Sequence, residues 1–248
     1  MKTKLLPCHI LAVFLLLSPA IQADAKDPTS ESGQSRPAVP ELFSNHPPLE
    51  KGVLLIANRS LHDPNFRQTV ILITEFSETG TIGLVINRPL QLPADKVFPN
   101  IGKITTASGN LHIGGPVGIN KLQFLIRTET ALDPNDEVFA DVYLVNTLKA
   151  FASILDGAPE MTTVRLYAGY AGWAAGQLES ELIRGDWYLW HADNKTVFSN
   201  SPDSVWPELF QKASAQWVDS CRFRSGCALC LFSCIIPAQD DQTASLLQ

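Results

Sequence analysis

Gly169-Tyr170-Ala171-Gly172-Trp173 decides the fold of this chain, with Gln177, Glu181 and Trp187 following at fixed spacing. Glycine adopts backbone conformations that are closed to other residues. The pattern therefore predicts a strand, a turn built by Gly169 and Gly172, and an amphipathic helix over 174–184. It includes no nucleophile with a neighbouring base, no metal-ligand set and no phosphate-binding loop. The stretch indicates a fold and names no reaction.

The helix predicted after the glycines has two faces. Three apolar residues recur every four positions and are expected to face a sheet: Ala174, Leu178 and Leu182. A second, polar stripe contains Gln177, Glu181 and Arg184. The amides at the helix start, with Gln177 and Glu181, are candidates for binding a small polar or anionic ligand. In the alternative interpretation the glycines only permit a tight turn, and Glu181 and Arg184 form a surface pair.

Apolar and β-branched runs predict the other strands. They lie at 52–57, 69–74, 81–86, 122–127, 142–145, 163–167 and 187–190. The second and third of these strands are expected to form a hairpin. A helix is predicted from Leu148 to Leu155, between an N-cap at Asn146 and a stop at Gly157, and another over 205–215. This order of elements predicts an α/β or α+β domain around a mixed β-sheet.

Three further turn motifs supply candidate ligand contacts. Gly114-Gly115-Pro116 allows another backbone to approach closely, Asp63 begins a turn, and Asn87-Arg88-Pro89 ends a strand. Neither a phosphate-loop lysine nor G-x-G-x-x-G spacing is present, which disfavours nucleotide binding. Plain turn chemistry is the alternative interpretation of all three. The complete tentative ligand set is Asp63, Asn87, Arg88, Gly114, Gly115, Gly169, Gly172, Gln177 and Glu181.

In their order these motifs closely resemble the YqgE/AlgH family of bacterial proteins, over residues 49–210. The matching segments are 52–57, Asp63-x-x-Phe66, 83–89, 114–117 and 169–187. The resemblance implies a compact domain whose mixed sheet bends into a pseudo-barrel with helices packed outside. The family is often labelled a transcriptional regulator, although its biochemical activity is not established. This chain departs from many relatives at Asn58-Arg59, where they have a proline, and in its N-terminal leader.

The N-terminus has the pattern of a secretory signal peptide over residues 1–25. A basic start is followed by the apolar run 10–17, which is too short to span a bilayer. Cleavage is expected after one of three alanines, Ala25 first, then Ala23 or Ala20. Residues 26–48 are rich in proline and polar residues, which predicts a flexible linker. We therefore expect a periplasmic or secreted protein, or a cytoplasmic one if the start codon is assigned too far upstream.

The C-terminal extension, residues 211–248, carries a cluster of cysteines: Cys221, Cys227, Cys230 and Cys234. Their spacings match no standard zinc pattern. In an oxidising compartment they allow two disulfides in three pairings. The alternative is an unstructured extension outside the domain.

Charge and motif content limit the function classes. The chain holds 19 Lys and Arg against 25 Asp and Glu, a net charge of −6, and nucleic acids bind chiefly through neutralised phosphates, so no nucleic-acid partner is expected. No metal or cofactor is expected either. Neither G-x-S-x-G nor H-E-x-x-H occurs, and the five histidines form no recognised triad arrangement. A hydrolase of unknown substrate, with Glu181 and Asp63 as the acid and base, is the enzymatic alternative.

The sequence thus predicts a non-catalytic binding or regulatory protein. Its pocket is expected near the glycine turn and the following helix, and its partner is a small polar ligand or an envelope protein. A structural envelope interaction protein is the remaining alternative. No transmembrane segment is predicted, and no oligomeric state follows from the sequence.

Overall fold

The computed structural model describes residues 46–97, 109–157 and 162–222. The predicted signal peptide, most of the predicted linker, and Cys227, Cys230 and Cys234 lie outside these residues.

Ten strands of the described residues form one sheet, in the order β10-β1-β2-β3-β9-β6-β8-β7, with β5 beside β9 and β4 beside β5. Their bounds are β1 Val53–Ala57, β2 Val70–Ser77, β3 Gly80–Val85, β4 Pro89–Pro93, β5 Asn110–Ile113, β6 Val117–Arg127, β7 Glu137–Phe139, β8 Val142–Val145, β9 Thr163–Ala174 and β10 Trp187–His191. All pairs are antiparallel except β5 with β9, which is parallel. The predicted mixed sheet is confirmed.

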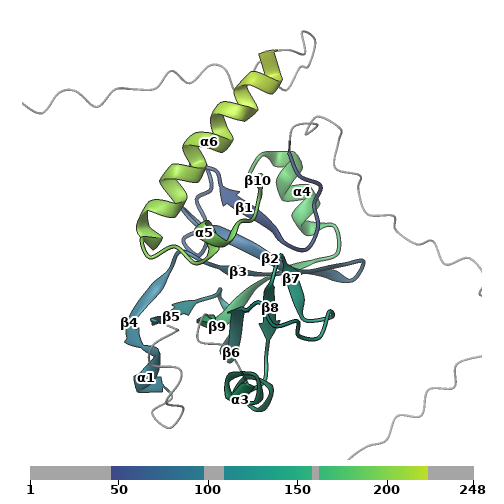
Figure 1. The fold of residues 1–248 in the computed structure, drawn as a ribbon. Coiled ribbons are helices and arrows are strands. Elements are labelled where there is room, and N and C mark those ends of the chain that lie inside the picture. The colour runs from purple at the N-terminus through teal and green to yellow at the C-terminus, as the bar shows by residue number, and fades with distance from the viewer. Residues whose placement is uncertain (1–45, 98–108, 158–161, 223–248) are drawn as a thin grey trace, which may run out of the picture. The chain divides into compact units, whose positions relative to one another are not determined.

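The long strand β9 joins the two halves of the sheet (Figure 1). Its C-terminal part, Ala171 to Ala174, pairs with β3, and its N-terminal part pairs with β5 and β6. Side chains alternate between the faces of a strand. Val164, Leu166 and Ala168 accordingly enter one hydrophobic cluster, whereas Tyr167, Ala171 and Trp173 enter the other.

The sheet curls strongly into a half-barrel, and Gly52 marks where the residue before β1 approaches the end strand β7. A Cβ added at Gly52 would lie 2.8 Å from the carbonyl oxygen of Val138 and 3.1 Å from the Cβ of Phe139. Gly52 also has a φ of 88°, which a side chain would disfavour. The residue before β1 can therefore lie directly against β7 only because it is glycine.

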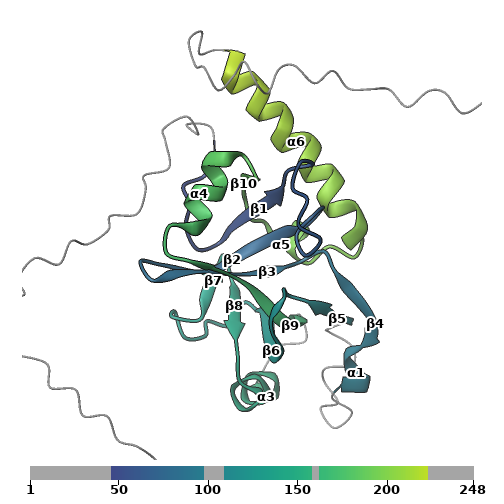
Figure 2. The same ribbon diagram turned by 180° about the vertical axis from the view of Figure 1, so that it is seen from behind.

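The helices lie beside the sheet in two groups. They are α1 Ala94–Val97, α3 Leu148–Gly157, α4 Gln177–Arg184, α5 Asn194–Val197 and α6 Pro202–Arg222. Figure 2 shows α4, α5 and α6 near β1 and β10, and α1 and α3 at the opposite end. In the first group the indole Nε1 of Trp206 donates to the carbonyl oxygen of Ala57 at 2.9 Å. In the second, Phe151 stacks on Phe124 with ring centroids 4.0 Å apart. The predicted pseudo-barrel with helices outside is confirmed.

Several strand predictions are confirmed, including the hairpin of β2 and β3. The predicted turn at Gly169 and Gly172 and the helix start at Ala174 are wrong. β9 continues through both glycines to Ala174, because Gly172 and Ala174 pair with Ile82 and Gly80 of β3. The turn comes later, at Gly176 with a φ of 73°, and the helix begins at Gln177. Ala174 is exposed and does not pack under the helix.

Two other boundaries differ from the sequence prediction. The side-chain oxygen of Thr147, and not Asn146, accepts from a backbone amide in the first turn of α3, that of Ala150 at 3.3 Å. Leu148, the first residue of the helix, is 47% exposed. The last helix, predicted over 205–215, runs from Pro202 to Arg222 and contains Cys221.

Candidate functional site

The predicted glycine sites meet where two backbones cross. Gly114 lies directly against Gly169, and a Cβ added at Gly115 would lie 2.2 Å from the carbonyl carbon of Tyr170. The Gly114 amide donates to Ala168 O at 2.9 Å, and the Gly114 carbonyl accepts from the Val85 amide at 2.8 Å. The structure thus brings Gly114, Gly115 and Gly169 together, and the crossing of β9 by the chain after β5 explains why they lack side chains.

Glu181 holds two tryptophans. Its Oε2 accepts hydrogen bonds from the indole Nε1 of Trp173 and of Trp187, both at 2.9 Å. Its Oε1 accepts from Gln177 Nε2 at 3.0 Å, and Gln177 Oε1 in turn accepts from the Ala174 amide at 3.1 Å. The stripe predicted to bind a ligand therefore fastens α4 to β9 and β10.

The surface pair of Glu181 with Arg184 is not observed. Arg184 contacts Asp186 instead, with Nη2 and Oδ2 at 2.6 Å. Arg184 is the last residue of α4 and Asp186 follows it. Because Arg184 pairs with Asp186, the Glu181 carboxylate is left to accept hydrogen bonds from the two indoles.

Asp63, Asn87 and Arg88 are brought together at one loop. Asp63 Oδ1 accepts from the Asn65 amide at 2.8 Å, closing a turn. Asn87 bridges to Gln68 O and the Val70 amide, and Arg88 Nη1 donates to Asn65 O at 2.6 Å. Burial and the neighbouring Arg67 guanidinium lower the pKa of Arg88, against the opposing effect of Asp63. These side chains hold the 63–69 loop onto the end of β3.

Phe66, in the same loop, packs against the two tryptophans that donate hydrogen bonds to Glu181. The Phe66 ring lies 6.2 Å from the Trp173 ring and 6.0 Å from the Trp187 ring, centroid to centroid. The motifs that the sequence presents far apart thus form one packed assembly. Gly172, one of the nine predicted ligand residues, lines an open cavity of about 370 Å³ along β3 and β9.

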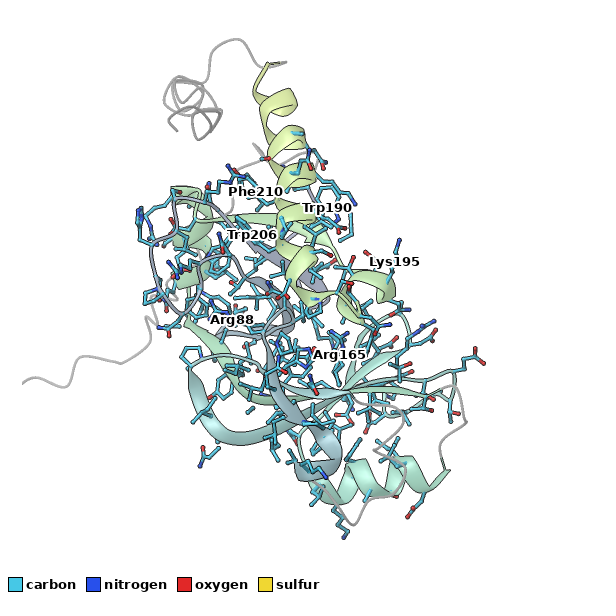
Figure 3. The ribbon with its side chains drawn as sticks, turned by 90° about the vertical axis from the view of Figure 1, so that its left-hand side faces the viewer. Arg88, Arg165, Trp190, Lys195, Trp206 and Phe210 are labelled. Carbon is cyan, nitrogen blue, oxygen red and sulfur yellow. The ribbon has the colours of Figure 1, made fainter. Side chains whose placement is uncertain are left out.

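A different cavity, of about 250 Å³, contains a buried cation. We call it the Arg165 cavity. It lies between β4, β5, the start of β9 and the segment after α5, and it is lined by Pro89, Gly109, Asn110, His112, Thr163, Val164, Arg165, Phe198, Ser199, Asn200 and Pro202. Figure 3 shows Arg165 below the aromatic side chains of Trp190, Trp206 and Phe210.

Arg165 is only 8% exposed. Its Nη1 donates to Val197 O at 3.1 Å, its Nη2 donates to Ser199 O, and its guanidinium carbon lies 5.9 Å from the Phe198 ring centroid. In the described part of the chain no carboxylate pairs with it. Buried charges are usually paired or bound to an ion. The carbonyl oxygens after α5 hold the side chain in place without neutralising it.

His112 lies beside Arg165 and is 5% exposed. Burial first, and then the Arg165 charge, lower the pKa of His112 to about 4, so the ring is neutral at neutral pH. Its Nδ1 is 2.9 Å from Asn110 O. The neighbouring Tyr167 ring has its centroid 5.4 Å from that of His112, and burial raises the pKa of Tyr167 to about 12. The cavity therefore combines one cation with one neutral imidazole.

The strand pairing explains why these residues meet. The parallel register of β5 and β9 sets His112 opposite Tyr167, and Arg165 lies on the same face of β9 as Tyr167. Sequence reasoning missed all three. The available signal was a charged residue within the apolar run Thr163-Val-Arg-Leu-Tyr167, and a histidine between Leu111 and Ile113.

Two kinds of feature are absent from residues 46–97, 109–157 and 162–222. No group of three or more His, Cys, Asp or Glu side chains there is placed to hold a metal ion. No helix there has the length and apolar character needed to cross a membrane.

Comparison with known proteins gives consistent matches. A family model described as AlgH-like matches residues 54–218. A UPF0301 protein of Chlorobaculum tepidum is 34% identical over 170 residues, which cover 68% of this chain and 89% of that protein. A UPF0301 protein of Chlamydia caviae is 32% identical over 170 residues, with the same two shares.

Two solved structures resemble the fold. The crystal structure of a protein from Corynebacterium diphtheriae has a TM-score of 0.57 and 27% identity, covering 78% of this chain and 97% of that one. The solution structure of the AlgH protein from Pseudomonas aeruginosa has a TM-score of 0.51 and 28% identity, covering 77% of this chain and 97% of that one.

Proposed function

The chain belongs to the AlgH-like family, and on this premise we propose that it is a non-catalytic binding protein whose ligand, a small anion, occupies the Arg165 cavity. The observation that carries the proposal is the position of Arg165. Its guanidinium lines a cavity of about 250 Å³, is more than nine-tenths buried, and has no acidic partner in the described ranges.

Electrostatics favours an anion over a neutral ligand. A buried charge without a counter-charge is destabilising, by several kcal/mol in proteins after relaxation. Carbonyl oxygens offset part of this cost through hydrogen bonds, and Arg165 has two of them. A bound anion would supply the missing opposite charge, and arginine is well suited to oxyanions because its planar group donates along two parallel directions.

The contacts of the predicted acid and base support binding over hydrolysis. Glu181 accepts from two indoles and from Gln177, and Asp63 closes a turn. Both carboxylates are engaged in these structural hydrogen bonds, and each would have to break them to act as a catalytic acid or base. The ligand site therefore moves from the predicted helix α4 to the Arg165 cavity, and the proposed class of protein, a binding or regulatory module, is kept.

The place of action is proposed from the leader. If residues 1–25 direct export, the ligand is met in the periplasm or outside the cell, and a direct role on a promoter is excluded for the mature protein. An envelope protein would then be the partner that responds to the loaded state. We expect no nucleic-acid partner, because the chain carries a net charge of −6.

The test is anion binding by the full chain and by Arg165 variants. Isothermal titration calorimetry would use inorganic phosphate, sulfate and acetate at low ionic strength. We expect wild-type protein to bind at least one of them, Arg165→Gln to lose the signal, and Arg165→Lys to be weakened, since a lysine cannot donate along two parallel directions.

Arg127→Gln is the matched control, because Arg127 is an exposed arginine on the neighbouring strand β6. Circular dichroism would establish that each variant is folded. The absence of binding to wild-type protein, or equal binding by wild-type and folded Arg165→Gln protein, would refute the proposal.

A further inference from the structure

We propose that the ligand of the Arg165 cavity is a small oxyanion that also carries an O–H donor, and that His112 selects it by accepting that hydrogen bond. Hydrogen phosphate groups and hydroxycarboxylates share this chemistry. The inference rests on the proposed function, since it concerns the same cavity, and it adds the requirement for a donor on the ligand.

His112 carries its proton on Nδ1. A carbonyl oxygen only accepts hydrogen bonds, so the contact between His112 Nδ1 and Asn110 O places the proton on Nδ1. In a neutral imidazole the other nitrogen is then an acceptor. Among the described residues the side chain of His112 makes only the hydrogen bond through Nδ1, and His112 is one of the residues that line the cavity. His112 therefore offers the cavity a lone pair.

The His112 ring stays neutral at neutral pH. Burial and the charge of Arg165 both oppose protonation, and they bring the pKa of His112 to about 4. At neutral pH the histidine is thus an acceptor and cannot serve as a second donor to an anion.

Arg165 has more N–H donors than its carbonyl partners use. A guanidinium has five N–H groups. Two are directed to Val197 O and Ser199 O, and the Tyr167 hydroxyl lies within reach of a third, which leaves two N–H groups for a ligand. The cavity thus offers donors from Arg165 and an acceptor from His112, and a ligand complementary to both must present an anionic oxygen and a hydroxyl.

The cavity dimensions agree with a small ligand. A volume of about 250 Å³ is near the lower end of small-molecule sites. Asn110, Thr163 and Asn200 add polar groups, while Phe198 and Pro202 add apolar surface. Inorganic phosphate or a short hydroxy acid has suitable size and polarity.

The cavity should prefer ligands that carry an O–H group, because the lone pair of His112 Nε2 needs a hydrogen-bond donor. A fully ionised sulfate would set an oxygen lone pair against the Nε2 lone pair, whereas hydrogen phosphate brings a proton to that contact. Leaving a buried acceptor unpaired weakens binding by about tenfold to a hundredfold. The same reasoning predicts that lactate binds better than propionate, which differs from it by the hydroxyl.

The experiment is calorimetry on the full chain with these two pairs of ligands at neutral pH. Wild-type protein is expected to prefer phosphate over sulfate, or lactate over propionate, by about tenfold or more. In His112→Phe, which keeps an aromatic ring against Tyr167, the members of a pair should bind equally. His191→Phe is the matched control, because His191 is an exposed histidine at the end of β10.

The outcomes separate the two proposals. Preference within the phosphate pair identifies a phosphate ligand, and preference within the carboxylate pair identifies a hydroxy acid; both support the inference. Equal affinities within both pairs, with binding lost in Arg165→Gln, would overturn the role of His112 and leave the proposed function standing. No binding to wild-type protein would overturn both.

A spectroscopic measurement covers the case in which His112→Phe does not fold. The imidazole nitrogen NMR signals of wild-type protein should show a neutral ring with its proton on Nδ1, and phosphate should shift Nε2 toward the value of a hydrogen-bonded acceptor. A proton found on Nε2 instead would refute the inference without any variant.

Discussion

Replacing Glu181 by alanine should destabilise the domain strongly. The Glu181 carboxylate is the shared acceptor for the indole N–H groups of Trp173 and Trp187. These tryptophans are 6% and 1% exposed, so solvent has little access to either donor once the carboxylate is gone. Alanine would leave both indole N–H groups without an acceptor.

The expected loss in the free energy of unfolding follows from the number of indole donors left without an acceptor. An unsatisfied buried donor costs about 1–3 kcal/mol, so two of them lower the free energy of unfolding by about 4 kcal/mol. Glu181→Gln keeps an acceptor oxygen near the indoles but loses the charge that strengthens both bonds, and it should cost about 1–2 kcal/mol. Domains of this kind have about 5–15 kcal/mol in total, so the alanine variant should lose between about a quarter and most of its stability.

The assay is urea unfolding followed by tryptophan fluorescence, which reports on the affected residues directly. Glu208→Ala is the control, because Glu208 is exposed on α6. The reasoning is refuted if Glu181→Ala unfolds within about 0.5 kcal/mol of that control. Such stability, combined with altered anion binding, would restore the sequence-based interpretation of Glu181 as a ligand contact.

Two further predictions concern His112 and the glycine crossing. The folded pKa of His112, about 4, lies below its ordinary value of 6.5, so the unfolded chain takes up the proton first and stability is lost as pH falls from 6.5 to 4. The loss should reach about 3 kcal/mol, and unfolding curves of His112→Phe should lack it; parallel pH profiles would contradict this. Gly115→Ala should lower stability by about 3 kcal/mol, because its Cβ would lie 2.2 Å from Tyr170, whereas Gly157→Ala has no atom within 4 Å and should be near neutral in thermal melts.

Local patterns predicted much of the fold. Apolar runs located β1, β2, β3 and β10, and a two-residue loop at Glu78 and Thr79 connects the predicted hairpin. These elements depend on neighbours in the chain. The short strands β4 and β5 escaped prediction because they are defined by pairing across longer stretches of chain, with each other and, for β5, with β9. β7 escaped prediction because it has only three residues, although it pairs with its neighbour β8.

The glycine stretch shows why patterns of neighbouring residues gave a wrong prediction at the site. Gly169 and Gly172 suggested a turn, but their partners are Val117, Ile119 and Ile82, which are distant in the sequence. Because of those contacts the stretch forms a strand, and its glycines allow other backbone segments to approach closely. The Arg165 cavity depends in the same way on the parallel pairing of β5 and β9, a contact that no local pattern encodes.

The position of β9 makes folding of the domain depend on a strand that is synthesised late. β1, β2 and β3 form one run of neighbouring strands, and β6, β8 and β7 form another, but only β9 lies between them. During synthesis these two groups emerge before the strand that unites them, and β10, which pairs with β1, emerges later still. Contacts between residues far apart in sequence slow folding. A nascent chain that ends before Thr163 should therefore hold two incomplete sheets, and the domain should close cooperatively once β9 has left the ribosome.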